Sequence, residues 1–184
     1  MPRNFLLVFA GCAVLALSLS GQEKHFRVGR APSAEELRHW GITVLPDGAG
    51  LPQGSGTAIR GERVYRDQCA GCHGDNGEGH QPLGPRLKGG IGSLRSADPI
   101  QTIGSFWPYA TTVWDYIYRA MPYTQPGTLS ANDTYAVTAY LLYLNGIILR
   151  NEVMNRETLP KVKMPNREGF VPDPRPDVTA PVRH

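Results

Sequence analysis

The sequence predicts an all-α fold with few helices, long irregular connections and extended ends. Three segments carry apolar or small residues at helical spacing. Glycine and proline are abundant, with 21 and 16 residues in a chain of 184, which indicates long loops between those helices. The length suffices for one domain of modest size with a small core.

Two of the predicted helices are expected to cross. The first spans 57–68, where Gly61 has no side chain and would let another backbone approach closely. The other spans 130–145, with Ser130 as its N-cap, Asp133 at the capping-box position and Gly146 after its end.

Two shorter helices complete the prediction. The segment 112–119 is aromatic and is stopped by Met121-Pro122. Nearer the N-terminus, 31–40 indicates a short helix capped by Ser33, followed by a Gly/Pro-rich loop over 46–56.

The most informative motif is Cys69-Ala70-Gly71-Cys72-His73, a C-x-x-C-H run directly after the first predicted helix. A zinc site would need two more ligands at matching spacing, and neither a second cysteine pair nor H-x-x-x-H follows. A dithiol redox pair would sit in an alternating strand and helix pattern, whereas this one precedes a Gly-rich loop. The pattern therefore predicts one covalent haem c, with both cysteines as attachment points and His73 as iron ligand.

The sixth iron ligand must come from elsewhere in the chain, and Met121 is the predicted residue. It follows His73 by 48 residues, stands between two helices and precedes Pro122. Met164 is the second choice because it also precedes a proline. Methionine and histidine ligation leaves no open position on the iron, so we expect a site that passes electrons and has no catalytic residue. Further candidate ligands are Met154, His25, His39, His80 and His184.

Residues around the iron ligands are predicted as well. A haem-ligating histidine needs an acceptor for its other ring nitrogen. The segment Gly84-Pro85-Arg86-Leu87 resembles the Gly-Pro-x-Leu pattern of class I cytochromes c, and this resemblance implies that the Pro85 carbonyl accepts from His73. Arg86, Trp107 and Tyr109 are candidates for contacts with the haem propionates, which need polar partners.

The N-terminal segment predicts export. An apolar run over 5–17 follows Arg3, and small residues lead to Gly21, so residues 1–20 are interpreted as a cleaved secretory signal that includes Cys12. An uncleaved membrane anchor is the competing interpretation, although the run is short for a bilayer. Without these residues the chain has 18 basic and 16 acidic side chains, which indicates neither nucleic-acid nor anionic-membrane binding.

The expected organisation has four parts. The signal over 1–20 precedes an N-terminal arm over 21–56, a haem domain over 57–149 and a Pro-rich C-terminal arm over 150–184. Neither arm can build a core alone, so each is expected to wrap around a partner or around the haem domain.

The order of a first helix, C-x-x-C-H and a terminal helix that crosses the first resembles the class I cytochrome c fold. Longer segments resemble a narrower family, the SoxD-type cytochrome c subunits of sulfur or sulfite dehydrogenases. The similarity runs from about residue 29 to residue 177, and the segments that carry it are 46–56, 102–112, 119–122, 139–145 and 164–170.

The resemblance implies a periplasmic electron-transfer subunit. In that family a molybdenum-containing SoxC subunit oxidises sulfane sulfur or sulfite, and the electrons pass through the cytochrome to a soluble cytochrome c. Two other functions are open to a monohaem protein. One is a free-standing periplasmic electron shuttle. The other is a catalytic thiosulfate-type cytochrome, which needs a cysteine besides Cys69, Cys72 and the signal residue Cys12.

Overall fold

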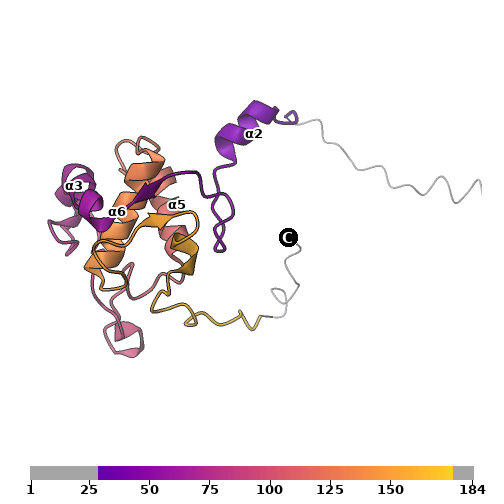
Figure 1. The fold of residues 1–184 in the computed structure, drawn as a ribbon. Helices are drawn as coiled ribbons and strands as arrows, with labels where there is room; N and C mark the ends of the chain where they lie inside the picture. The colour runs from indigo at the N-terminus through magenta and orange to yellow at the C-terminus, as the bar shows by residue number, and fades with distance from the viewer. Residues whose placement is uncertain (1–28, 176–184) are drawn as a thin grey trace, which may run out of the picture. The chain divides into compact units, whose positions relative to one another are not determined.

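The computed structural model describes residues 29–175, without the side chains of 38–40. The chain divides into two units between Trp40 and Gly41. The second unit contains the helices α3 (Ala58–Gln68), α4 (Ala70–His73), α5 (Ala110–Ala120) and α6 (Ala131–Leu144), with two short 3-10 helices, η1 (Ser93–Arg95) and η2 (Leu159–Lys161) (Figure 1). The predicted all-α class and the three central helices are confirmed, with boundaries shifted by one or two residues.

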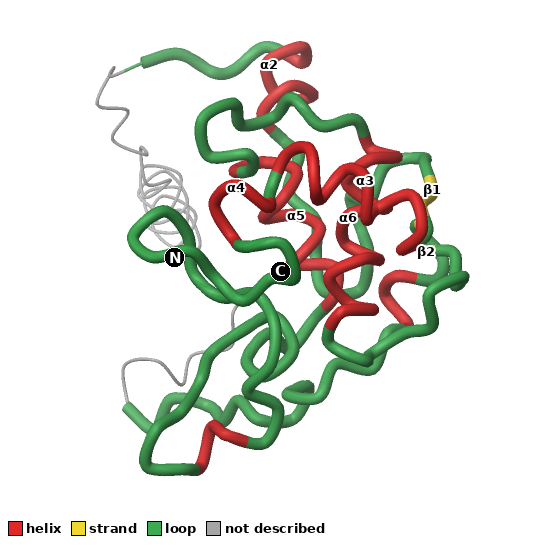
Figure 2. Tube along the Cα trace, turned by 90° about the vertical axis from the view of Figure 1, so that its left-hand side faces the viewer, coloured by secondary structure: helices red, strands yellow, loops and turns green. Residues whose placement is uncertain are grey.

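The crossing of α3 and α6 is the most extensive helix contact in the unit (Figure 2). Gly61 is buried there, and a Cβ at this position would collide with the carbonyl oxygen of Ala136. One turn later, the rings of Tyr65 and Tyr140 lie 5.2 Å apart. The predicted cap is present too, since the Ser130 side chain accepts a hydrogen bond from the Asp133 amide at 3.1 Å.

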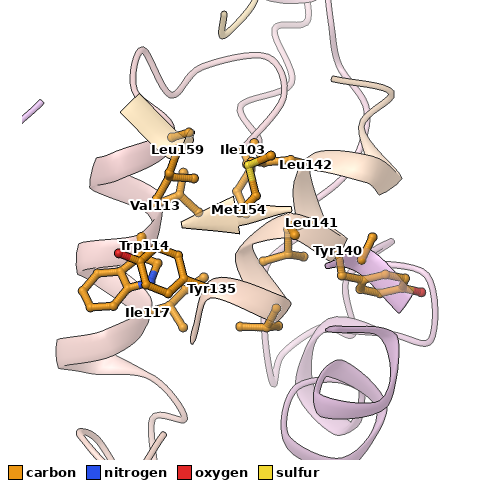
Figure 3. Close-up of a cluster of buried hydrophobic side chains, with 14 of the residues drawn as sticks. Ile103, Val113, Trp114, Ile117, Tyr135, Tyr140, Leu141, Leu142, Met154 and Leu159 are labelled. Carbon is orange, nitrogen blue, oxygen red and sulfur yellow. The ribbon is translucent and has the colours of Figure 1, made fainter. Parts of the chain in front are cut away.

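Much of the core lies between α5 and α6, and its largest fully buried side chains are aromatic. Trp114 from α5 and Tyr135 from α6 are completely buried, with ring centroids 5.2 Å apart. Figure 3 shows Val113 and Ile117 on the same side of α5, next to Leu159 and Tyr135 respectively. Val113 and Ile117 are four residues apart, so α5 presents one continuous apolar face.

The segments on either side of the expected haem domain also pack on this core. β1 (Ser55–Gly56) pairs antiparallel with β2 (Met154–Asn155), so that Gly56 faces Met154. Leu51, Met154, Leu159 and Met164 are all buried. The packed unit therefore extends beyond 57–149. Sequence periodicity does not reveal this because single apolar residues are separated by glycine, proline and polar residues.

The first unit contains the predicted short helix, α2 (Ala34–Trp40). Ser33 caps it, since its hydroxyl accepts from the Glu36 amide at 3.2 Å and its own amide donates to the Glu36 carboxylate at 2.7 Å. Hydrogen bonds from Arg30 and then Ser33 lower the pKa of Glu36 to about 2.

The expected signal over 1–20 and the last residues of the C-terminal arm, 176–184, lie outside the described residues. Among residues 29–175, no helix has the length and apolar character needed to cross a membrane.

Candidate haem-binding site

The cysteine motif forms a single helical turn at the end of α3. The Cys69 amide continues the hydrogen bonding of α3 to the Tyr65 carbonyl at 2.8 Å, and the Cys69 carbonyl accepts from the amides of Cys72 and His73. Both thiols are free, with Cys69 half-buried and Cys72 exposed. Burial, followed by the neighbouring Cys72, raises the pKa of the Cys69 thiol to about 12. This one turn of five residues thus carries two thiols and an imidazole.

The imidazole of His73 is oriented by the loop that follows. Its Nδ1 donates to the Pro85 carbonyl at 2.8 Å, which is the predicted hydrogen bond and leaves Nε2 to act as a ligand. Gly84 lies directly beneath, where a Cβ would be 2.5 Å from the Cys72 carbonyl oxygen and 3.1 Å from His73 Nδ1. Only glycine lets this loop approach the motif so closely.

Two further hydrogen-bonded side chains support this arrangement. The Tyr65 hydroxyl donates to the Gly74 carbonyl at 2.7 Å, so α3 holds the end of the motif. Asn145, at the C-cap of α6, accepts from the Gly89 amide at 3.0 Å and donates to the Leu87 carbonyl at 3.2 Å. The loop that carries Pro85 is therefore tied to the end of α6.

A largely apolar cavity of about 640 Å³ opens beside the motif. Its lining brings together Cys69, Cys72, His73, Pro85 and Met121, although these residues come from three separate stretches of sequence. Apolar side chains from the 102–107 segment, α5 and α6 supply much of the remaining wall, among them Ile103, Phe106, Val113, Ile117, Val137 and Leu141.

Met121 is the methionine that the cavity contains. It is the C-cap residue of α5, is partly buried and precedes Pro122 through a cis peptide bond. Met154 and Met164 are buried in the core instead, and neither they nor His80 line the cavity. The side chain of His39 is not described, and the remaining two histidine candidates, His25 and His184, lie outside the described residues.

The three propionate candidates do not share one place. Arg86 and Trp107 line the cavity, and Trp107 packs edge-to-face against Tyr116 with ring centroids 5.7 Å apart. Tyr109 is not part of the lining. Its ring is covered by the guanidinium of Arg167, 4.2 Å from the ring centroid. This is a cation–π contact on the ring face, and hydrogen bonding of the Tyr109 hydroxyl to a propionate stays a prediction.

These residues fit a haem c. The cavity has the volume and apolar character of a cofactor site, two thiols face it at C-x-x-C spacing, and an oriented imidazole and a thioether are available as iron ligands. A second hollow of about 600 Å³, beside Arg60, Arg63 and Asp133, has a mainly polar and charged lining and contains no motif residue.

Sequence reasoning does not identify Tyr65 and Asn145 as supports of the site. Tyr65 is expected only on the apolar face of its helix, and its hydroxyl carries no sequence signal. Asn145 stands at the predicted end of a helix, where an asparagine is common. Its two loop contacts join residues 56 and 58 positions apart in the chain.

Known proteins resemble this chain in sequence and in fold. The family model described as Cytochrome c matches residues 58–145. A crystal structure of the sulfane dehydrogenase SoxCD from Paracoccus pantotrophus contains a similar chain, with a TM-score of 0.76 and 48% sequence identity. That match covers 82% of this chain and 73% of the other.

Two curated relatives are more distant. The thiosulfate dehydrogenase of Stutzerimonas stutzeri is 31% identical over 111 residues, and that of Thiomonas intermedia is 28% identical over 110 residues. In both cases the match covers 60% of this chain. The chain spans only about a third of the length of these relatives, 34% and 32% respectively.

Proposed function

This chain belongs to the SoxD-type cytochrome c subunits, and on that premise we propose that it relays electrons from a sulfur-oxidising molybdenum subunit to a soluble cytochrome c. The coarser function, a haem-binding electron-transfer protein related to sulfane and thiosulfate dehydrogenases, follows from its family and relatives. The proposal adds the electron donor, the electron acceptor and the sulfur compound that is oxidised.

One observation carries the proposal. The chain is 48% identical to a chain of the SoxCD sulfane dehydrogenase, over 82% of its own length. The match extends beyond the haem-binding region of 58–145 that the general family model covers. Similarity outside that region favours a shared role rather than a shared haem fold alone.

The residues of the cavity support electron relay. A bound haem c supplies a reversible one-electron couple. Cys69 and Cys72 would hold it covalently, and His73 would ligate its iron with the ring fixed by Pro85. Met121 would ligate from the end of α5. The apolar wall would limit the access of solvent to the bound haem, and solvent access and local dielectric control its reduction potential.

Two protein ligands also explain why no catalytic residue is proposed. With histidine and methionine on the iron, no position is open for a sulfur substrate. Substrate chemistry therefore belongs to the partner, for which a molybdenum-containing SoxC-like subunit is proposed. A single C-x-x-C-H motif in this sequence supports one haem, and export by residues 1–20 would place the complex in the periplasm.

The C-terminal arm is proposed to contact that partner. Residues 171–175 have no regular secondary structure and are exposed. They follow Phe170, whose ring packs on Phe106. Truncation after Phe170 leaves that contact intact. We expect it to lower the yield of complex in co-purification while the haem content is unchanged, and an unchanged yield would remove the arm from the interface.

A second candidate is oxidation of thiosulfate by this chain itself. The similarity to two thiosulfate dehydrogenases favours it. Against it, the described residues contain only Cys69 and Cys72, and both are assigned to haem attachment. No cysteine of that part of the chain is then left to ligate the iron.

Co-purification with metal and haem analysis tests the proposal. The tagged cytochrome should isolate with a molybdenum-containing protein, at one haem per cytochrome chain. A cytochrome that remains monomeric in the presence of this protein would instead support a free-standing periplasmic shuttle.

A further inference from the structure

We propose that Asn166 is a positioning residue for the haem cavity. It belongs to a strap, residues 164–170, that holds the cavity wall formed by Phe106 and Trp107. By holding this wall the strap limits the access of water to the haem and so sets its reduction potential. The inference rests on the haem site but not on the electron donor, so it can be tested without any partner.

The strap is held at its first residue and by two turn hydrogen bonds. It begins at Met164, which is buried in the core, and two turn hydrogen bonds follow, from the Arg167 amide to the Met164 carbonyl and from the Gly169 amide to the Asn166 carbonyl, both at 3.1 Å. A Cβ on Gly169 would collide with the Asn166 side-chain oxygen. The side-chain amide of Asn166 therefore has little room to move on the side of Gly169.

The Asn166 side chain contacts residues 106–109, called the wall segment because Phe106 and Trp107 line the cavity. Asn166 Nδ2 donates to the Phe106 carbonyl at 2.7 Å, across 60 residues of sequence. Phe170 packs edge-to-face on the Phe106 ring at 5.3 Å, and Arg167 covers the ring of Tyr109. Three side chains of the strap thus contact three parts of the wall segment.

The wall segment in turn borders the haem. Phe106 and Trp107 line the cavity, and the segment leads directly into α5, which contributes Val113 and Ile117 to the same lining. Without Asn166, the partly buried Phe106 carbonyl loses its side-chain donor and must turn to water. Water admitted at this wall favours the oxidised, more positively charged form of a bound haem, because solvent access and local dielectric control the potential.

The competing interpretation is that the strap contributes to stability alone. The reduction potential and the pattern of amide exchange separate the two. A purely structural strap would leave the potential unchanged and, by lowering the free energy of unfolding, would speed exchange throughout the unit rather than in 102–109 alone. Asn155 provides a matched control. Its side-chain oxygen accepts from the Glu157 and Thr158 amides at 2.8 and 2.9 Å, in another turn of the C-terminal segment, and it does not line the cavity.

The experiment compares Asn166→Ala, Asn155→Ala and the unmodified haem-loaded protein by redox titration and hydrogen exchange. We expect Asn166→Ala to favour the oxidised form by roughly three- to tenfold, where tenfold corresponds to about 59 mV for one electron. We also expect faster exchange of amides in 102–109, with the methionine–iron absorption band retained. Asn155→Ala should match the unmodified protein in both measurements.

An unchanged potential and unchanged exchange in Asn166→Ala would overturn the proposal, as would equal changes in Asn155→Ala. If Asn166→Ala does not fold, Phe170→Ala replaces it, because this half-exposed ring can be removed without opening the core. The same direction of change, at smaller size, is expected there, and its absence would refute the role of the strap.

Discussion

Replacement of Asn145 by alanine tests whether the end of α6 supports the haem site. Asn145 is 8% exposed and its side-chain amide makes three hydrogen bonds, to the Gly89 amide and to the carbonyls of Leu87 and Leu141. Alanine removes all three at once. The loop over 84–89, which includes Pro85, then loses its tie to α6.

The loss in free energy of unfolding can be estimated from the backbone groups that lose their hydrogen bond to the Asn145 side chain. The Leu141 carbonyl keeps the backbone amide of residue 145 as a donor, so its loss is small. The Gly89 amide and the Leu87 carbonyl lose this partner in a partly buried place, at about 1–3 kcal/mol for each such group when no water replaces it. The two groups together could cost about 2–6 kcal/mol. Because water has partial access to them, we expect a loss of about 3 kcal/mol in the free energy of unfolding. For a unit of this size that corresponds to a fall in Tm of roughly 6–12 °C.

Chemical and thermal unfolding of the haem-loaded protein, followed by circular dichroism and haem absorbance, measures this change. Asn132→Ala is the control, because Asn132 accepts one exposed hydrogen bond from the Ser55 amide and should cost about 1 kcal/mol or less. A free energy of unfolding within about 0.5 kcal/mol of the unmodified protein, the ordinary range for surface changes, would refute the role assigned to Asn145.

Three further predictions concern the iron ligand, the helix crossing and the α6 cap. Met121→Ala should abolish the methionine–iron absorption band and let ferric haem bind cyanide, whereas the core variant Met164→Leu should do neither. Gly61→Ala should destabilise the protein by about 2 kcal/mol in urea unfolding, since overpacking against the Ala136 backbone costs up to about 3 and helix propensity returns about 1. The exposed variant Ile59→Ala on the same helix should lack this loss. For Asp133, hydrogen bonds from Ser130 and then Arg60 hold the carboxyl pKa below its ordinary 3.8, so its stabilising contribution is present above about pH 4 and is lost as pH falls through the lowered value. Asp133→Asn should therefore be less stable than the unmodified protein by about 0.5–1 kcal/mol at about pH 7, and the gap should close in acid; a gap that persists in acid would contradict the ion-pair and capping role.

The central helices and the haem motif are predictable because their signals are local. Helical spacing in 57–68 and the cap at Ser130 depend on neighbours within one or two turns. Gly61 is a longer-range prediction, and it succeeds because a glycine inside a helix has few other reasons to be there. The contact between His73 and Pro85 is predictable for a different reason, namely the resemblance of the Gly84-Pro85 loop to a known pattern.

The remaining features depend on packing between distant segments, which leaves little trace in local sequence. β1 and β2 have two residues each, too few to show alternation. Asn145 and Asn166 look like ordinary loop or cap residues, and their partners are 56 to 60 positions away. The cation–π contact between Arg167 and Tyr109 is another such case, since it joins two residues 58 positions apart and the sequence gives no signal for it.

Substrate-dependent haem reduction tests the central claim most directly. The cytochrome, alone or with the co-purified molybdenum subunit, is mixed without oxygen with a sulfane-sulfur compound, sulfite or thiosulfate, and the haem spectrum is recorded. The account predicts reduction by sulfane sulfur or sulfite only when the molybdenum subunit is present, and no reduction of the isolated cytochrome by any of the three. A haem that stays oxidised in the complex, or one that thiosulfate reduces without the partner, would contradict it.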